Sequence, residues 1–205
     1  MRVKVCGITR YEDARLAAEL GAWGLGFIFW PSSKRSISKE GALAILERLA
    51  KESLLPPKRV GVFVNSPKAE ILDVAESLSL TTVQLHGEED SDFVADIPYE
   101  TIKAFRPRCL EDLEQMKGFD ADYFLVDSFV PGAYGGTGKV ADWRLAKKAK
   151  EYGRLLLSGG LTPLNIGEAR KTVDCFAYDL ASGVEVSPGV KDHGLLRELF
   201  ARANS

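Results

Sequence analysis

Cysteine and histidine are scarce in this chain of 205 residues, which has three of the first and two of the second. Cys6, Cys109 and Cys175 form no CxxC pair, and His86 and His193 show no HxH or HExxH spacing. An odd number of scattered thiols argues against a disulfide framework, and the missing spacings argue against a metal site. We therefore predict a protein that needs no metal, in a reducing compartment such as the cytoplasm.

The chain also lacks a long apolar run and an excess of charge of one sign. Its longest uncharged stretch, residues 20–33, is interrupted by three glycines and a proline. That stretch falls short of the roughly 20 apolar residues needed to span a bilayer. The formal net charge is −2, the charges are scattered, and no signal-peptide pattern opens the chain. These features predict neither a membrane nor a nucleic-acid partner.

What the sequence does contain is a series of eight short β-rich runs. They are residues 3–6, 24–30, 59–64, 82–86, 101–105, 123–127, 154–157 and 176–180. Helix-start signals lie between them: Thr9 with Glu12, Ser66-Pro67, Asp142 ahead of residues 143–152, and Thr162-Pro163. With no linker in the chain, this order predicts one α/β domain over residues 1–205, a compact (β/α)8 TIM barrel. An open doubly wound sheet is the alternative.

Side chains alternate along a strand, and this predicts which of them enter the barrel. In the first run Lys4 and Cys6 share the face opposite two valines. The same reasoning brings five polar side chains together at the carboxyl ends of the strands, where barrel enzymes place their sites. They are Cys6, Gln84, His86, Asp127 and Asp179.

Two of these side chains are candidates for proton transfer, and each has a structural alternative. A free cysteine such as Cys6 is more often a small buried hydrophobe, which is our interpretation of Cys109 and Cys175. Asp127 ends an apolar run, where a carboxylate is costly unless it is paired, solvated or working. A helix N-cap or a buried, hydrogen-bonded carboxylate is the alternative for Asp127.

Glycine-rich segments follow the last three runs. Residues 132–139 are not a Walker A loop, because Ala133 and Val140 occupy two of its required positions. They suit a lid over a substrate or a merely mobile loop. Residues 158–163 and 182–185 follow the seventh and eighth runs, where barrels often bind phosphate through backbone N–H groups. Tight turns that need a positive φ explain one such loop easily, but both less well.

Two further residues carry open interpretations. Arg35 follows the second run, where its guanidinium suits a bidentate grip on a carboxylate or is simply solvated. His86 is a candidate general base or a hydrogen-bonded structural group.

Together these segments resemble one known family, over the whole chain. They are Lys4-Val5-Cys6-Gly7-Ile8-Thr9, Ser33-Lys34-Arg35, Gln84-Leu85-His86-Gly87, Leu125-Val126-Asp127, Gly135-Gly136-Thr137-Gly138-Lys139, Leu157-Ser158-Gly159-Gly160-Leu161 and Ser182-Gly183-Val184-Glu185. In this order they closely resemble the phosphoribosylanthranilate isomerases of tryptophan biosynthesis. The resemblance implies a cofactor-free Amadori rearrangement of N-(5-phosphoribosyl)anthranilate to 1-(2-carboxyphenylamino)-1-deoxyribulose 5-phosphate, the third step from chorismate.

The resemblance also implies roles for individual residues. Asp127 matches the general acid that protonates the ribose ring oxygen, and Cys6 the general base that takes the C2 proton. Arg35 matches the residue that holds the anthranilate carboxylate, while Gln84, His86 and Asp179 become candidate substrate-binding residues. The candidates for phosphate binding are Gly136, Gly138, Gly159, Gly160, Ser182 and Gly183. Ala181 stands where the family commonly has a first serine, which puts one hydroxyl contact in doubt.

These roles make demands on two pKa values. A general base and a general acid near neutral pH need Cys6 and Asp127 shifted from about 8.5 and 3.9, respectively, and a bell-shaped pH profile is expected. Lys4 is our candidate for favouring the thiolate, and desolvation for keeping Asp127 protonated.

Three rival functions remain at this point. A thiol hydrolase would pair Cys6 with His86, and a second rival is a barrel that binds phosphosugars without catalysis. The third is a related barrel enzyme of the tryptophan or histidine pathway, which more often uses paired aspartates or a lysine. The expected partner is a small phosphosugar. Apolar loop residues such as Trp30 and Phe129 leave room for a homodimer or for contact with other tryptophan-pathway enzymes.

Overall fold

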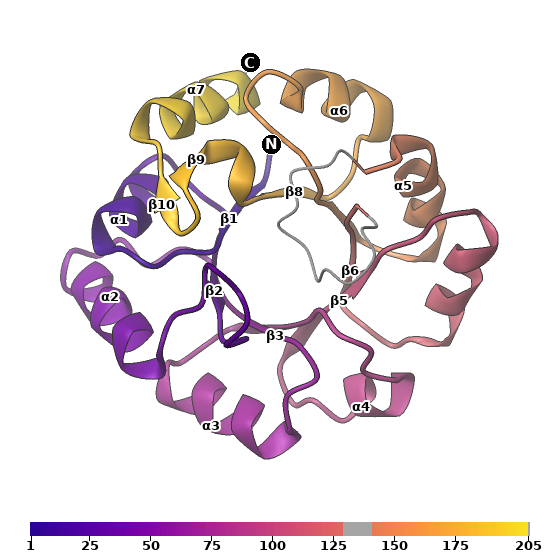
Figure 1. Ribbon diagram of the computed structural model, residues 1–205, viewed down its shortest axis with the longest axis horizontal. Helices are drawn as coiled ribbons and strands as arrows, with labels where there is room; N and C mark the ends of the chain where they lie inside the picture. Colours follow the sequence, from indigo (N-terminus) through magenta and orange to yellow (C-terminus); the bar gives the residue numbers. More distant parts are fainter. Residues whose placement is uncertain (129–140, 205) are drawn as a thin grey trace.

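The computed structural model describes residues 1–128 and 141–204, and in it eight parallel strands close into a barrel (Figure 1). The strands are β1 (Val3–Cys6), β2 (Gly24–Ile28), β3 (Lys58–Phe63), β4 (Thr82–Leu85), β5 (Glu100–Phe105), β6 (Tyr123–Val126), β7 (Leu155–Leu157) and β8 (Ala177–Leu180). Each pairs with the next along the chain, and β1 pairs with β8 through Val3 opposite Tyr178. The predicted barrel is confirmed, and each strand lies within a residue or two of its predicted run.

Helices surround the barrel as an outer ring (Figure 1). They are α1 (Tyr11–Glu19), α2 (Lys39–Lys51), α3 (Lys68–Ser77), α4 (Ser91–Ala95), α5 (Trp143–Ala149), α6 (Ile166–Val173) and α7 (His193–Asn204). In α2 the Ser38 side chain caps the first turn by accepting from the Gly41 N–H, at 3.1 Å. Its buried residues Ala42, Ile45, Leu46 and Leu49 recur at helical spacing, so one stripe packs against the strands.

Two connections depart from the regular β-α order. After β5 the chain forms a 3₁₀ helix, Glu111–Gly118, in place of an α-helix. After β8 it forms a 3₁₀ turn, Ser182–Val184, and then a hairpin of β9 (Glu185–Ser187) and β10 (Val190–Lys191) before α7. The sequence analysis did not predict this hairpin. No helix in residues 1–128 and 141–204 is long and apolar enough to cross a membrane.

Several predicted helix starts were wrong in detail. Thr9 does not cap α1, because its hydroxyl donates to the Gly189 carbonyl of the hairpin. Helix α3 has Pro67 rather than Ser66 at its N-cap. At Thr162-Pro163 the chain first makes a turn, and α6 begins only at Ile166. The Asp142 prediction is confirmed, since its carboxylate accepts from the Arg144 N–H at 2.9 Å.

Strand alternation divides the apolar core into two parts. Alternate residues such as Val5, Val83 and Phe124 face the helices in the larger outer core. The inner core fills the barrel and consists of Cys6, Val60, Val62, Ile102, Ala104, Tyr123, Leu125, Leu156 and Ala177. The predicted inward and outward faces of β1, β4, β6 and β8 are therefore confirmed. The N-terminal end of the barrel is closed by aromatic rings, with Trp23 5.7 Å from both Tyr123 and Phe176 between ring centroids.

A charged side chain, that of Lys4, lies inside this barrel. Lys4 is fully buried, and its ammonium donates to Asp179 Oδ1 at 2.8 Å, which joins β1 to β8. The neighbouring strand β2 offers Gly24 and Gly26, so no side chain competes for the space. Burial by itself lowers the pKa of Lys4, but the facing Asp179 carboxylate and the Cys6 thiol raise it above its usual range.

One interpretation of a cysteine was wrong. Cys109, predicted to be a buried small hydrophobe in a helix, is exposed just before the 3₁₀ helix after β5. Cys175 is partly buried, and its thiol donates to the Ala177 carbonyl.

The Lys4–Asp179 pair generates a prediction about stability. Lys4→Met leaves Asp179 buried without its partner, so we expect a loss of about 3–5 kcal/mol in the free energy of unfolding. Lys4→Met combined with Asp179→Leu should recover most of that loss, because no buried charge is left unpaired. Urea unfolding followed by circular dichroism measures both, and a wild-type midpoint for Lys4→Met alone would contradict the prediction.

Candidate active site

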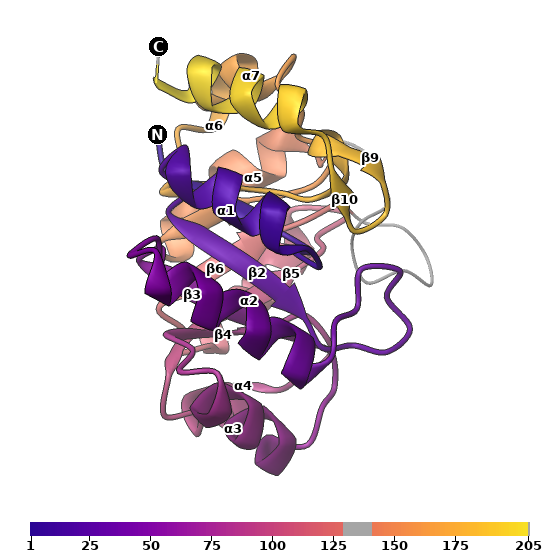
Figure 2. The same cartoon turned by 90° about the vertical axis from the view of Figure 1, so that its left-hand side faces the viewer.

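The predicted side chains converge at the carboxyl ends of the strands. The β9–β10 hairpin projects from this end, opposite the end where the two chain termini lie (Figure 2). Cys6 is the last residue of β1, Asp127 directly follows β6, and Asp179 lies in β8. Gln84 in β4 and His86 just after it complete the group, and all five side chains are buried.

Two lysine side chains, those of Lys4 and Lys191, act on the Cys6 thiol. Below it in the barrel lies the Lys4 ammonium, and opposite it on β2 lies Gly26. A Cβ at Gly26 would come within 2.7 Å of the Cys6 Sγ and 3.1 Å of the Lys4 Nζ. Burial raises the pKa of the Cys6 thiol above its ordinary value, and Asp179 adds to this, while Lys4 and Lys191 act to lower it. The two lysines therefore offset only part of the cost of a buried thiolate.

Asp127 faces the Gln84–His86 pair. The Gln84 amide nitrogen lies 2.8 Å from His86 Nδ1. In this orientation the amide nitrogen donates to Nδ1, and the other ring nitrogen, Nε2, is turned toward Asp127. That Nε2 is 3.6 Å from Asp127 Oδ2, while Asp127 Oδ1 accepts from the Ser128 N–H at 2.7 Å. The imidazole thus faces the carboxyl group and not Cys6, which removes the pairing that a thiol hydrolase requires.

A hollow lined by small residues adjoins Asp127. Its lining includes Ser158, Gly159, Gly160, Ser182, Gly183 and Asp179. Gly159 and Gly160 have φ of +88° and +62°, values that glycine adopts at little cost. A Cβ at Gly159 would be 2.9 Å from Asp127 Oδ1, so this loop packs directly on the candidate acid.

The two loops around the hollow hold each other in place. A Cβ on Gly183 would lie 1.8 Å from the Leu161 carbonyl oxygen, so only glycine permits this approach. Asn165 braces the first loop, because its amide donates to the Gly160 carbonyl at 2.9 Å and accepts from the Thr162 N–H at 2.8 Å. The predicted residues Gly136 and Gly138, with the whole 132–139 segment, lie outside the described residues.

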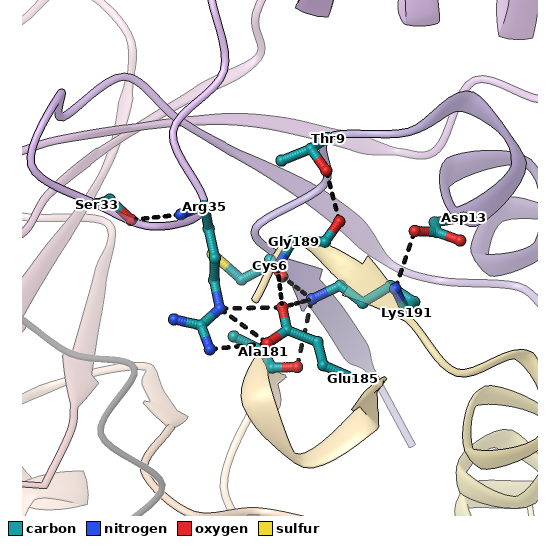
Figure 3. A network of polar contacts seen from close by, with 9 residues as sticks. All are labelled: Cys6, Thr9, Asp13, Ser33, Arg35, Ala181, Glu185, Gly189 and Lys191. Atoms are coloured by element: carbon teal, nitrogen blue, oxygen red, sulfur yellow. Dashed lines mark hydrogen bonds and ion pairs between the residues drawn. The ribbon is translucent and has the colours of Figure 1, made fainter. Parts of the chain in front are cut away.

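Arg35 reaches the site from the loop after β2. Its aliphatic part crosses Gly7, the residue next to Cys6, where a Cβ would be 2.7 Å from Arg35 Cδ. Its guanidinium is bound by Glu185 of β9, with Nε 2.9 Å from Oε1 and Nη2 2.7 Å from Oε2 (Figure 3). Arg35 is therefore not the solvated loop residue of the alternative interpretation.

Glu185 and Lys191 are the site residues that the sequence analysis missed. Lys191 of β10 donates to Glu185 Oε1 at 2.8 Å and to the Cys6 carbonyl at 2.6 Å (Figure 3). Burial acts to raise the pKa of Glu185, but Arg35 and Lys191 hold it below its usual range. Burial lowers the pKa of Lys191, with Glu185 opposing the shift. Valine alternating with polar residues on both sides of Pro188-Gly189 was the available signal for a hairpin.

Buried polar atoms without partners mark the inner wall of the site. Within the described residues, Gln84 Oε1 and His86 Nε2 are buried and make no hydrogen bond. Such atoms are costly unless a ligand or water satisfies them. In the same part of the chain, no group of three or more His, Cys, Asp or Glu side chains is placed to hold a metal ion.

Comparisons with known proteins agree on one family. Residues 3–202 match the family described as N-(5'phosphoribosyl)anthranilate (PRA) isomerase. An N-(5'-phosphoribosyl)anthranilate isomerase of Geobacter metallireducens is 42% identical, with 100% of each chain covered. A crystal structure of the Thermus thermophilus enzyme superposes with a TM-score of 0.88 at 41% identity, covering 100% of this chain and 98% of that one. Another solved isomerase, in complex with reduced 1-(o-carboxyphenylamino)-1-deoxyribulose 5-phosphate, gives 0.84 at 40% identity with the same coverage.

The packing of Arg35 on Gly7 generates a prediction with a matched control. Gly7 and Gly21 both have positive φ, +71° and +85°, but a Cβ at Gly21 meets no atom within 4 Å. Gly21→Ala should cost only backbone strain, about 1–2 kcal/mol of unfolding free energy. Gly7→Ala should cost roughly 1–3 kcal/mol more, because it also displaces Arg35. Equal urea midpoints for the two variants would show that Arg35 does not depend on Gly7.

Proposed function

The chain belongs to the N-(5'-phosphoribosyl)anthranilate isomerase family, and on that premise we propose that Cys6 and Asp127 carry out its proton transfers. The reaction is the cofactor-free Amadori rearrangement of N-(5-phosphoribosyl)anthranilate to 1-(2-carboxyphenylamino)-1-deoxyribulose 5-phosphate. It is an isomerisation, so protons are moved and none is gained or lost overall. One group must give a proton and another must take one.

The order of groups across the site is the observation that carries this proposal. The candidate base Cys6 is followed by Gly7, on which Arg35 packs, and the candidate acid Asp127 packs on Gly159 of the small-residue hollow. The substrate has the same order. Its C2 lies next to the carbon that bears the anthranilate, and its ring oxygen is bonded to the carbon that carries the phosphorylated arm. A carboxylate at Arg35 and a phosphate in the hollow would therefore bring C2 toward Cys6 and the ring oxygen toward Asp127.

Each step then has a donor or an acceptor. Asp127 protonates the ring oxygen, the C1–O bond breaks, and the anthranilate nitrogen lone pair forms the C=N bond of a Schiff base. The Cys6 thiolate removes the C2 proton, and the C2–H electron pair forms the enolamine double bond while the C=N π pair returns to nitrogen. Protonation at C1 and loss of the C2 hydroxyl proton then give the ketone.

Other residues bind and orient the substrate. We assign the phosphate to backbone groups of Gly159, Gly160, Ser182 and Gly183, since small residues and tight turns let N–H groups approach an anion. Gln84 Oε1 and His86 Nε2 are buried and make no hydrogen bond within the described residues, so they are suited to the sugar hydroxyls. Asp179 is paired with Lys4, so its part in substrate binding is limited to the carboxylate edge that lines the hollow. The homodimer and the cytoplasmic location stay predictions.

Removing either proton carrier tests the roles. Cys6→Ala and Asp127→Asn should each lower kcat by about 10²–10⁴-fold, the usual contribution of one general acid or base. The assay follows the loss of anthranilate fluorescence during turnover. Cys175→Ala, at the opposite end of the barrel, is the matched control and should retain activity. Near wild-type turnover in either site variant would exclude that residue from its role.

The raised pKa of Cys6 has a consequence for pH dependence. The thiolate is the minor form at neutral pH, so the rate at which iodoacetamide labels Cys6 should keep rising with pH to and beyond about 8.5, the ordinary thiol value. The measurement uses a Cys109→Ser background, since Cys109 is exposed and would otherwise react. A plateau reached below pH 7 would show that the two lysines outweigh burial.

A further inference from the structure

The Glu185 carboxylate is buried and makes several hydrogen bonds, so a substrate would not readily displace it from Arg35. Besides its three hydrogen bonds with the guanidinium, it accepts from Lys191 at 2.8 Å and from the Gly189 N–H at 3.3 Å. Its side chain is 4% exposed and that of Arg35 is 11% exposed. Both carboxylate oxygens are therefore engaged, and a paired charge that is buried to this degree does not leave its partners cheaply.

Lys191 connects this pair to the position of the candidate base. Its fully buried ammonium donates to the Cys6 carbonyl and, at 3.3 Å, to the Ala181 carbonyl as well as to Glu185. Its own backbone N–H donates to Asp13 of α1 at 2.9 Å, which fixes the strand that carries it (Figure 3). The hairpin thereby ties the end of β1, the start of the Ser182–Val184 turn and the Arg35 loop together.

We propose that Glu185 is a positioning residue. It fixes the guanidinium of Arg35 so that the guanidinium binds the substrate carboxylate with the substrate C2 placed at Cys6. The inference rests on the proposed role of Arg35. Glu185 uses the Nε and Nη2 edge of the guanidinium, and Nη1 takes no part in this pair. Arg35, Lys191 and Glu185 together carry one net positive charge, which matches one carboxylate.

A competing role for Glu185 would predict the opposite effect. If Glu185 merely occupied Arg35 until the substrate displaced it, its removal would free the guanidinium and improve recognition of the carboxylate. The five hydrogen bonds that Glu185 accepts and its burial favour positioning, so its removal should weaken recognition.

The experiment compares two substrates that differ only in the carboxylate. They are N-(5-phosphoribosyl)anthranilate and N-(5-phosphoribosyl)aniline, and the readout is the ratio of their kcat/KM values. Glu185→Gln should lower this ratio on the order of 10- to 100-fold, because a displacement of the Arg35 guanidinium by about 1 Å would misplace the carboxylate-bearing substrate and slow its turnover by that factor. Turnover of the aniline substrate should change far less. A general loss of folding would instead lower the turnover of both substrates alike.

Two further variants complete the test. Glu185→Asp keeps the negative charge but shortens the side chain by one methylene, so it should also lower the ratio. It replaces the glutamine variant in the test if that variant does not fold. Glu100→Gln removes a lysine-paired carboxylate at the opposite end of the barrel, and should leave the ratio unchanged.

The outcomes separate this inference from the function on which it rests. If Arg35→Met lowers the ratio but both Glu185 variants leave it unchanged or raise it, positioning by Glu185 is overturned and the role of Arg35 stands. If Arg35→Met itself leaves the ratio unchanged, the proposed role of Arg35 fails, and the inference fails with it.

Discussion

The pairing of β1 with β8 closes the barrel and governs how the site is built. It brings Lys4 within 2.8 Å of Asp179, from opposite ends of the sequence, and so makes a buried ammonium tolerable inside the barrel. An unpaired charge there would cost several kcal/mol, which is enough to threaten a domain of ordinary stability. With the pair in place, the same ammonium also acts electrostatically on the thiol of Cys6, which lies two residues further along β1 on the same face.

Glycines allow backbone and side chains to approach closely around the site. Gly26 makes room for the thiol and the Lys4 ammonium, Gly7 for the stem of Arg35, and Gly183 for the Leu161 carbonyl. In each case the space that a Cβ would take is already occupied by the group being positioned. Rigid placement costs little at the moment of reaction because these groups are already ordered by packing, which is the physical meaning of a preorganised site.

The pKa of Cys6 is set by two opposing groups of interactions. Burial and Asp179 disfavour the thiolate, while Lys4 and Lys191 favour it, and burial is the largest of these contributions. The sequence analysis named Lys4 as the residue that favours the thiolate, and its direction of action is as predicted. The net direction was not predictable, because desolvation depends on how completely the barrel covers the sulfur and no local pattern encodes that.

Local patterns in the sequence were enough to predict the barrel, the inward faces of its strands and the end at which the polar residues meet. Period-two alternation and β-α order are local signals that survive folding unchanged. The partners of the charged side chains were not predictable and emerge only in the folded chain: Asp179 for Lys4, Glu185 for Arg35, and Lys191 for the Cys6 carbonyl. These contacts join residues 150 or more positions apart, so their energies depend on closure and burial, which a linear pattern does not contain.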